Sequence, residues 1–145
     1  MIAIGSDHGG YELKIKIEEH LKKKGMEFRD CGCYSEESAD YPDIAETVCK
    51  EVVSGRAERA ILICGTGIGI SIAANKIDGI RAALCADVYS AKMCRNHNDA
   101  NVLCLGGRVT GSELAFMIVD TYLRETFDGG RHEGRVKKIM ELENK

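Results

Sequence analysis

The stretch from Ile61 to Asn75 constrains the fold of this chain more than any other. It begins as the apolar run 61–64, breaks at the alternating glycines Gly65, Gly67 and Gly69, and resumes as an apolar, alanine-rich segment. This pattern predicts a buried parallel strand, a tight turn and a buried helix. Because backbone amides at a helix N-terminus attract negative charge, we expect the turn to stabilise an anion or a thiolate.

The rest of the chain alternates in the same way between short apolar runs and amphipathic segments. Strand–helix alternation with short connections indicates a parallel sheet covered by helices on both faces. We therefore predict an α/β fold, a Rossmann-like three-layer αβα sandwich with a doubly wound, five-stranded parallel sheet. The further strands are predicted at 2–5, 27–31, 79–85 and 101–105, and the helices at 11–24, 42–54, 87–95, from a capping box at 110–113 onward, and at about 131–142.

Composition narrows the class of protein. The chain has 145 residues, which predicts a single domain covering 1–145. Its net charge of −3 indicates no nucleic-acid surface, and no apolar run reaches the roughly 18 residues that a membrane span needs. The seven cysteines are odd in number, and several lie in apolar runs, where a thiol behaves as a small hydrophobe. We expect a cytoplasmic protein without a disulfide framework or a structural zinc site.

Polar residues follow three of the predicted strands. A doubly wound sheet binds its ligands at the carboxyl ends of its strands, near the topological switch point. This rule predicts that Asp7–His8, Cys64–Gly69 and Gly106–Arg108 gather at one edge of the sheet. The polar run 96–99 follows the fourth predicted helix rather than a strand, so this rule does not place it at that edge.

Cys64 has two interpretations. It is either a buried small hydrophobe or a reactive thiol facing the amides of the glycine turn. The turn itself reads G-x-G-x-G rather than G-x-G-x-x-G and follows the third predicted strand, so dinucleotide binding is a weak alternative. A P-loop is absent from the sequence, since no Gly-Lys-Ser/Thr follows the turn.

The charged candidates are also ambiguous. Asp7 is either a plain helix cap or a functional carboxylate, and His8 is either exposed or part of the site. His97 lies in a run that composition alone would place in a solvated loop. Arg131 and Arg135 share one helical face, which is either solvated or suited to gripping a phosphate.

Taken together, the motifs closely resemble the ribose-5-phosphate isomerase type B family over essentially the whole chain. The most specific are the Cys-Gly-Thr-Gly block at 64–67 and the Asn-His-Asn-Asp block at 96–99. The resemblance also rests on Gly5-Ser6-Asp7-His8-Gly9-Gly10, Asp40-Tyr41-Pro42, Asn75-Lys76, Gly106-Gly107-Arg108 and Gly129-Gly130-Arg131-His132.

This resemblance implies an aldose–ketose isomerase of ribose 5-phosphate and ribulose 5-phosphate that needs neither metal nor cofactor. Cys64 would be the base at C1 and C2, Thr66 would move protons at the oxygens, and His97 would open the furanose ring. The amides of Gly65, Gly67, Ile68 and Gly69 would stabilise the oxyanion, Asp7, Tyr41 and Asn98 would contact the sugar, and His8, Arg108, Arg131 and Arg135 would hold the phosphate.

The resemblance further implies a homodimer, or a dimer of dimers, whose active sites lie between subunits. His97 and the C-terminal arginines would then come from the partner chain, and the helix at about 131–143 would pack on the partner subunit. Two alternatives stay open: an isomerase of allose or galactose 6-phosphate, and a non-catalytic module that binds nucleotides or sugar phosphates.

Overall fold

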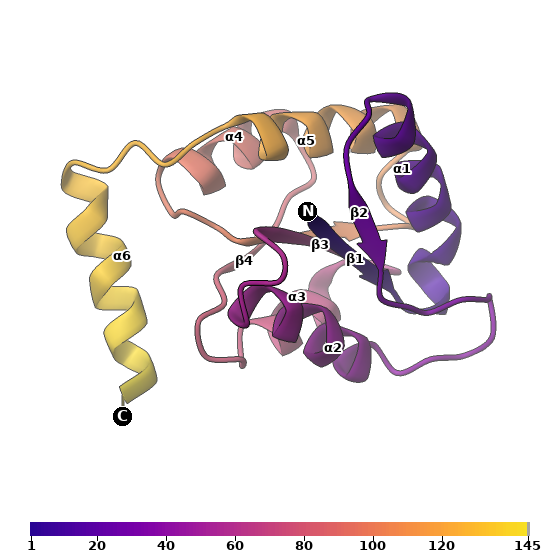
Figure 1. Cartoon of the computed structure of the whole chain (residues 1–145), viewed down its shortest axis with the longest axis horizontal. Helices are drawn as coiled ribbons and strands as arrows, with labels where there is room; N and C mark the ends of the chain where they lie inside the picture. Colours follow the sequence, from indigo (N-terminus) through magenta and orange to yellow (C-terminus); the bar gives the residue numbers. More distant parts are fainter. Residues whose placement is uncertain (145) are drawn as a thin grey trace.

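The computed structural model describes residues 1–144, and its elements alternate as predicted (Figure 1). Short apolar runs form the strands, and the amphipathic segments between them form the helices. The strands are β1 (Ile2–Ser6), β2 (Phe28–Asp30), β3 (Arg59–Cys64), β4 (Ala82–Leu84) and β5 (Val102–Gly106). The helices are α1 (Tyr11–Lys23), α2 (Tyr41–Val53), α3 (Ile68–Ala74), α4 (Val88–Asn96), α5 (Ser112–Arg124) and α6 (Arg131–Glu141), with short 3₁₀ turns at His8–Gly10 and Leu142–Asn144.

The five strands form one parallel sheet in the order β2-β1-β3-β5-β4, which confirms the predicted fold class. β1 and β5 are buried along their whole length, and β3 is buried from its second residue onward. Central strands of a parallel sheet are covered on both faces and therefore read as continuous apolar runs. This burial explains why the apolar runs beginning at residues 2, 61 and 102 were recognisable in the sequence.

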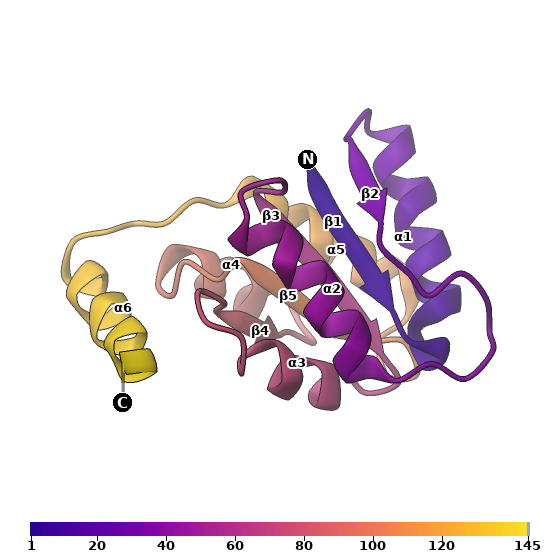
Figure 2. The same cartoon turned by 60° about the horizontal axis from the view of Figure 1, so that its bottom comes forward.

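Helices cover the sheet on two faces (Figures 1 and 2). On one face Ile17 of α1 and Ile118 of α5 pack with Ile61 and Ile63 of β3 in one apolar cluster, which α4 also joins. On the other face α2 and α3 pack against Leu62 in a second cluster. The alternation of side chains along β3 thus divides the core into two layers.

Two predicted boundaries were wrong. β4 is shorter than the predicted strand at 79–85, because the backbone N–H of Arg81 donates to the Asn101 side chain instead of to a ladder partner. The capping box was also misplaced: Gly111 is the N-cap of α5, and no side chain caps that helix. Thr110 lies one residue earlier, where its N–H donates to the carbonyl of Gly106.

The last helix, α6, lies beside the three-layer body at the end of the extended segment 125–130 (Figures 1 and 2). None of its described side chains is buried. Near its end, an Arg81 guanidinium nitrogen lies 3.2 Å from Met140 Sδ, and the Gly79 N–H donates to Glu143. Within residues 1–144, no helix combines the length and the apolar character needed to cross a membrane.

Candidate active site

The direction of winding reverses between β1 and β3, so the predicted ligand site lies where these strands end. The segments expected there do meet. The Asp7 N–H donates to the carbonyl of Ile63 over 3.1 Å, and the Gly107 N–H donates to the carbonyl of Cys64 over 2.8 Å. The Arg108 N–H donates to the carbonyl of Gly65 over 2.9 Å. These bonds confirm that the polar segments after β1, β3 and β5 share one edge.

Cys64 ends β3 with its side chain directed at the glycine turn. Its Sγ accepts a hydrogen bond from the backbone N–H of Gly67 over 3.1 Å, and the residue is only 4% exposed. Gly67 has a φ of +81°, and a Cβ there would lie 2.5 Å from Leu84 Cδ1. Only glycine satisfies both conditions, and its amide therefore reaches the sulfur.

Two further candidates surround this turn. Thr66 is exposed, and its Oγ1 accepts the N–H of Ile68 over 3.1 Å. The Tyr41 ring, at the start of α2, lies so close to Gly69 that a Cβ there would be 2.8 Å from Tyr41 Cζ. The structure therefore brings a thiol, a hydroxyl and a phenol to the same glycine turn.

A cavity of about 480 Å³ lies at the same edge, and both His8 and Arg108 line it. The Ala39 N–H donates to His8 Nδ1 over 3.2 Å, and a Cβ at Gly65 would lie 3.2 Å from a guanidinium nitrogen of Arg108. This contact places Arg108 against the glycine turn. Other polar residues on the wall, which the sequence analysis did not single out, are Glu12, Lys16, Glu36 and Ser112.

Asp7 is buried at this edge and acts as the helix cap that one interpretation predicted. Its Oδ1 accepts the N–H of Gly10 over 3.1 Å. The carboxylate therefore holds the turn that carries His8.

The remaining candidates gather at the opposite edge of the sheet. His97 follows α4 and precedes the amino end of β5, where Val102 pairs with Ala60 near the start of β3. The six residues of β3 separate this edge from Cys64 by roughly 17 Å. His97 and Asn98 are thus not brought to the thiol within one chain.

His97 contacts a second histidine at that edge. Its ring stacks on the ring of His132, with centroids 4.1 Å apart and planes 11° from parallel. Partial burial, and then the neighbouring His97, Arg131 and Arg135, lower the pKa of His132. Arg131 and Arg135 lie on α6 beside His132, so the structure gathers the two histidines and the two arginines in a second cluster. Asn98 follows His97 directly in the chain and lies at the same edge.

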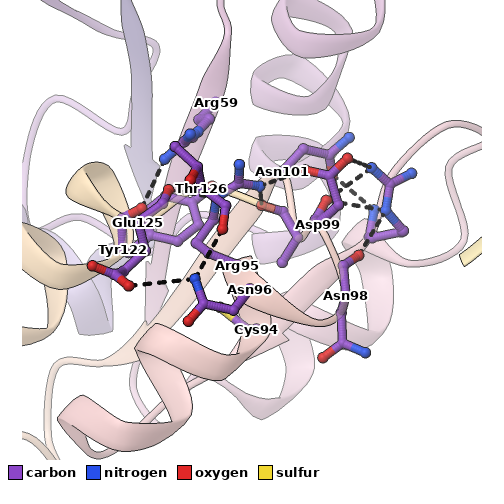
Figure 3. A network of polar contacts seen from close by, with 12 residues as sticks. Arg59, Cys94, Arg95, Asn96, Asn98, Asp99, Asn101, Tyr122, Glu125 and Thr126 are labelled. Carbon is purple, nitrogen blue, oxygen red and sulfur yellow. Dashed lines mark hydrogen bonds and ion pairs between the residues drawn. The ribbon is translucent and has the colours of Figure 1, made fainter. Parts of the chain in front are cut away.

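A polar network holds the second cluster in place (Figure 3). One Arg95 guanidinium nitrogen donates to Asp99 Oδ1 over 2.8 Å and to the carbonyl of Ala100 over 2.7 Å. Asn96 donates from its side chain to the carbonyl of Thr126 over 2.8 Å. This network was not predicted from the sequence, although the density of Arg, Asn and Asp at 95–101 was a signal for it.

The other buried thiols serve the core, which agrees with their prediction as small hydrophobes. Burial raises the pKa of Cys49 to about 12, and it raises the pKa of Cys104 as well. Within residues 1–144, no three metal-ligating side chains gather in one place.

Comparison with known proteins connects this geometry to a family. The Ribose/Galactose Isomerase family model matches residues 2–139. Ribose-5-phosphate isomerase B of Escherichia coli is 51% identical over 144 residues, which are 99% of this chain and 97% of the relative. The D-erythrulose-4-phosphate isomerase of Pectobacterium atrosepticum is 45% identical, over 95% of this chain and 91% of the relative.

Solved structures agree. The structure of Clostridium thermocellum ribose-5-phosphate isomerase B superposes with a TM-score of 0.97 at 58% identity, covering 99% of this chain and 97% of that one. Sequence, topology and length therefore lead to the same conclusion: the chain belongs to the Ribose/Galactose Isomerase family.

Proposed function

We propose that this chain is an isomerase that interconverts D-ribose 5-phosphate and D-ribulose 5-phosphate. The observation that carries the proposal is the Cys64 thiol, held under a glycine turn at the switch point and beside a cavity that bears His8 and Arg108. The relatives named ribose-5-phosphate isomerase B support the same reaction. The substrate is a small sugar phosphate, and the proposal involves no nucleic acid, membrane, metal or cofactor.

The chemistry is a proton transfer between neighbouring carbons. Cys64 as thiolate takes the proton from C2 of the open-chain aldose. The C2–H electron pair forms a double bond between C1 and C2, and the π electrons of the C1 carbonyl move to its oxygen, which gives an enediolate. Thr66 carries the proton exchanged between O1 and O2, and Cys64 returns its proton to C1. Amides of the 65–69 turn stabilise the negative oxygen, an electrostatic contribution that is often the largest in catalysis.

Substrate binding follows from the groups at the same edge. His8 and Arg108 line the cavity and supply positive hydrogen-bond donors for the phosphate. Tyr41 contacts Gly69 and is 39% exposed, so its hydroxyl is available to the sugar. Asp7, which caps the turn before α1, completes this side of the sugar pocket.

The second cluster completes the site only if it comes from another copy of the chain. His97 opens the furanose ring by acid–base transfer, Asn98 contacts the sugar, and Arg131 and Arg135 bind the phosphate. A separation of roughly 17 Å along β3 is far longer than a pentose phosphate. We therefore infer a homodimer, alone or as a dimer of dimers, in which the single domain 1–145 lends α6 and His97 to its partner.

Two other substrate classes deserve a direct comparison. The sequence leaves allose 6-phosphate and galactose 6-phosphate open as substrates, and one relative is named for a four-carbon sugar phosphate. The test is an isomerase assay with chelator present, in which ribose 5-phosphate is compared with these hexose 6-phosphates and with a tetrose 4-phosphate. We expect the highest kcat/KM for ribose 5-phosphate. A higher kcat/KM for a hexose phosphate would make that sugar phosphate the assigned substrate. If no aldose phosphate is turned over, the proposal that the chain is an isomerase fails.

The role of Cys64 has its own variant in that assay. Cys64→Ala removes the base and leaves the phosphate site intact, so turnover should fall at least about 100-fold while ribose 5-phosphate still binds. Calorimetry measures the binding. Cys49→Ala, a core thiol on α2, is the matched control and should keep its turnover if it folds. Rates near those of the unmodified protein in Cys64→Ala would remove Cys64 as the base.

We also infer that the enzyme works in the cytoplasm. The seven cysteines are all free in the described structure, and five of them are buried among core residues. Thiols of this kind persist in a reducing compartment.

A further inference from the structure

We propose that His132 is a positioning residue for His97, whose ring it holds by face-to-face stacking. The proposal rests on the ring-opening role proposed for His97 and extends it to the ring that stacks on it. The two rings lie 4.1 Å apart and 11° from parallel, within the range of aromatic stacking. Both residues belong to the same chain, so the pair needs no residue of a partner copy.

The His97 ring is oriented by this stack and not by a hydrogen bond. Within residues 1–144, the His97 imidazole takes part in no hydrogen bond, and the backbone N–H of His97 donates to the carbonyl of Met93 over 2.8 Å. An acid–base catalyst must be held within hydrogen-bond reach of the proton that it transfers. The His132 ring is therefore the contact that restricts the side-chain torsions of His97.

Hydrogen bonds already hold the backbone on the His97 side. Asp99 has a φ of +48°, and its carbonyl accepts a bond from Arg81 over 2.8 Å. Its carboxylate accepts a bond from Arg95 over 2.8 Å. These contacts fix the turn that carries His97 but not the direction of its ring.

The His132 side is tied to the same turn. The side chain of Asn96 donates to the carbonyl of Thr126 (Figure 3). The Asp128 N–H donates to the carbonyl of Asn96 over 2.9 Å. Segment 125–130, which joins α5 to α6, is thus bonded to the end of α4 just before the first turn of α6. Since Arg131 precedes His132, the stack sets the ring-opening histidine and a phosphate-binding guanidinium at one fixed separation.

The charges around the pair favour one neutral ring. Arg131 and Arg135 face His132 from α6, His97 faces it from the end of α4, and Asp128 opposes them from segment 125–130. Together with partial burial, the positive neighbours lower the pKa of His132. The lowered pKa favours the neutral form of the His132 ring that stacks on His97.

The test compares cyclic and linear substrates in two variants of His132. A tetrose 4-phosphate cannot close a furanose ring because its C4 hydroxyl carries the phosphate, so its turnover does not need ring opening. His132→Ala should lower kcat for ribose 5-phosphate between about threefold and tenfold, the value of one aromatic stack. Turnover of the tetrose phosphate should change less than about twofold, and His132→Phe, which keeps a flat ring, should restore most of the loss.

Glu133→Gln, on the exposed neighbouring position of α6, is the matched control and should leave both activities unchanged. Equal losses on both substrates, or a His132→Phe variant no better than His132→Ala, would overturn the positioning role. The ring-proton NMR signals of His97 give a readout without substrate: His132→Ala should remove a ring-current shift from them. If that shift is present but no protein turns over ribose 5-phosphate, the proposed function fails rather than the stack.

Discussion

At the scale of single residues, Gly67 determines the geometry of the thiol. Its left-handed backbone turns the amide toward Cys64 Sγ, and its missing side chain leaves room for Leu84 and Leu105. The alternating glycines of the sequence therefore have a specific purpose. Without a Cβ, the backbone of the turn can lie close to neighbouring backbone and to the Cys64 sulfur, at the edge where β1, β3 and β5 end.

We expect Gly67→Ala to destabilise the fold by at least about 2 kcal/mol. A Cβ would add a left-handed strain and lie 2.5 Å from Leu84 Cδ1 and 2.9 Å from the carbonyl carbon of Leu105. Urea unfolding measures the loss. Gly55→Ala is the control, because Gly55 has the same φ of +81° but open space around it. It should cost only about 1 kcal/mol, and equal losses would show that packing at Gly67 contributes nothing.

At the scale of elements, α1 carries a buried charge cluster against the edge strand β2. The Lys14 ammonium is fully buried and lies 2.7 Å from Asp30 Oδ1, and it also donates to the carbonyl of Cys33. Glu18, one turn later on α1, lies beside the same carboxylate. Burial first, and then the hydrogen bond and negative charge of Asp30, raise the pKa of Glu18 to about 7.

This shift makes stability depend on pH. In the folded state Glu18 keeps its proton up to about pH 7, whereas in the unfolded chain it loses the proton near its ordinary pKa. Stability is therefore lost as pH rises between the two pKa values. Glu18→Gln cannot ionise, so at pH 8 it should be more stable than the unmodified protein by on the order of 2 kcal/mol, with little difference at pH 4.

Chemical unfolding across this pH range checks the prediction. Glu19→Gln is the matched control, since Glu19 is the exposed neighbour on the same helix. It should not stabilise the protein at pH 8, because the Glu19 side chain is already in contact with water. A constant effect of Glu18→Gln from pH 4 to pH 8 would contradict the assignment.

Elements with strong periodicity were predictable, and elements defined by their contacts were not. Burial leaves a pattern in the sequence of these elements. Buried strands appear as the continuous apolar runs of β1, β3 and β5, and the buried face of α2 appears as apolar residues at helical spacing. The cap of α5 was misplaced because Thr-x-x-Glu at 110–113 matches a capping box, while the Gly106 carbonyl takes the Thr110 N–H. Thr110 therefore belongs to the turn that follows β5, and Gly111 takes the N-cap position.

At the scale of the whole molecule, the arrangement of the two clusters predicts complementation between inactive variants. If each site combines Cys64 of one copy with His97 of the other, a mixed dimer of Cys64→Ala and His97→Ala contains one intact site. Random association makes half of the dimers mixed, so co-refolding should recover about a quarter of the original activity.

The control mixes two variants of the same cluster, Cys64→Ala and Thr66→Ala. Their mixed dimer has no intact site, and co-refolding should give no more activity than the average of the separate variants. Ribose 5-phosphate turnover after co-refolding measures both mixtures. No recovery in the Cys64→Ala and His97→Ala mixture would show that the site is not shared.

The sequence by itself determined the alternation of strands and helices, the parallel sheet and the gathering of polar strand ends around Cys64. These features follow from local periodicity and from the rule that parallel strands end at one edge. Only the tertiary structure decided that His97 lies at the opposite edge, that it stacks on His132 across the segment 125–130, and that Lys14 is buried beside Asp30. Such pairings join residues far apart in the sequence, and the packing of the folded chain creates them.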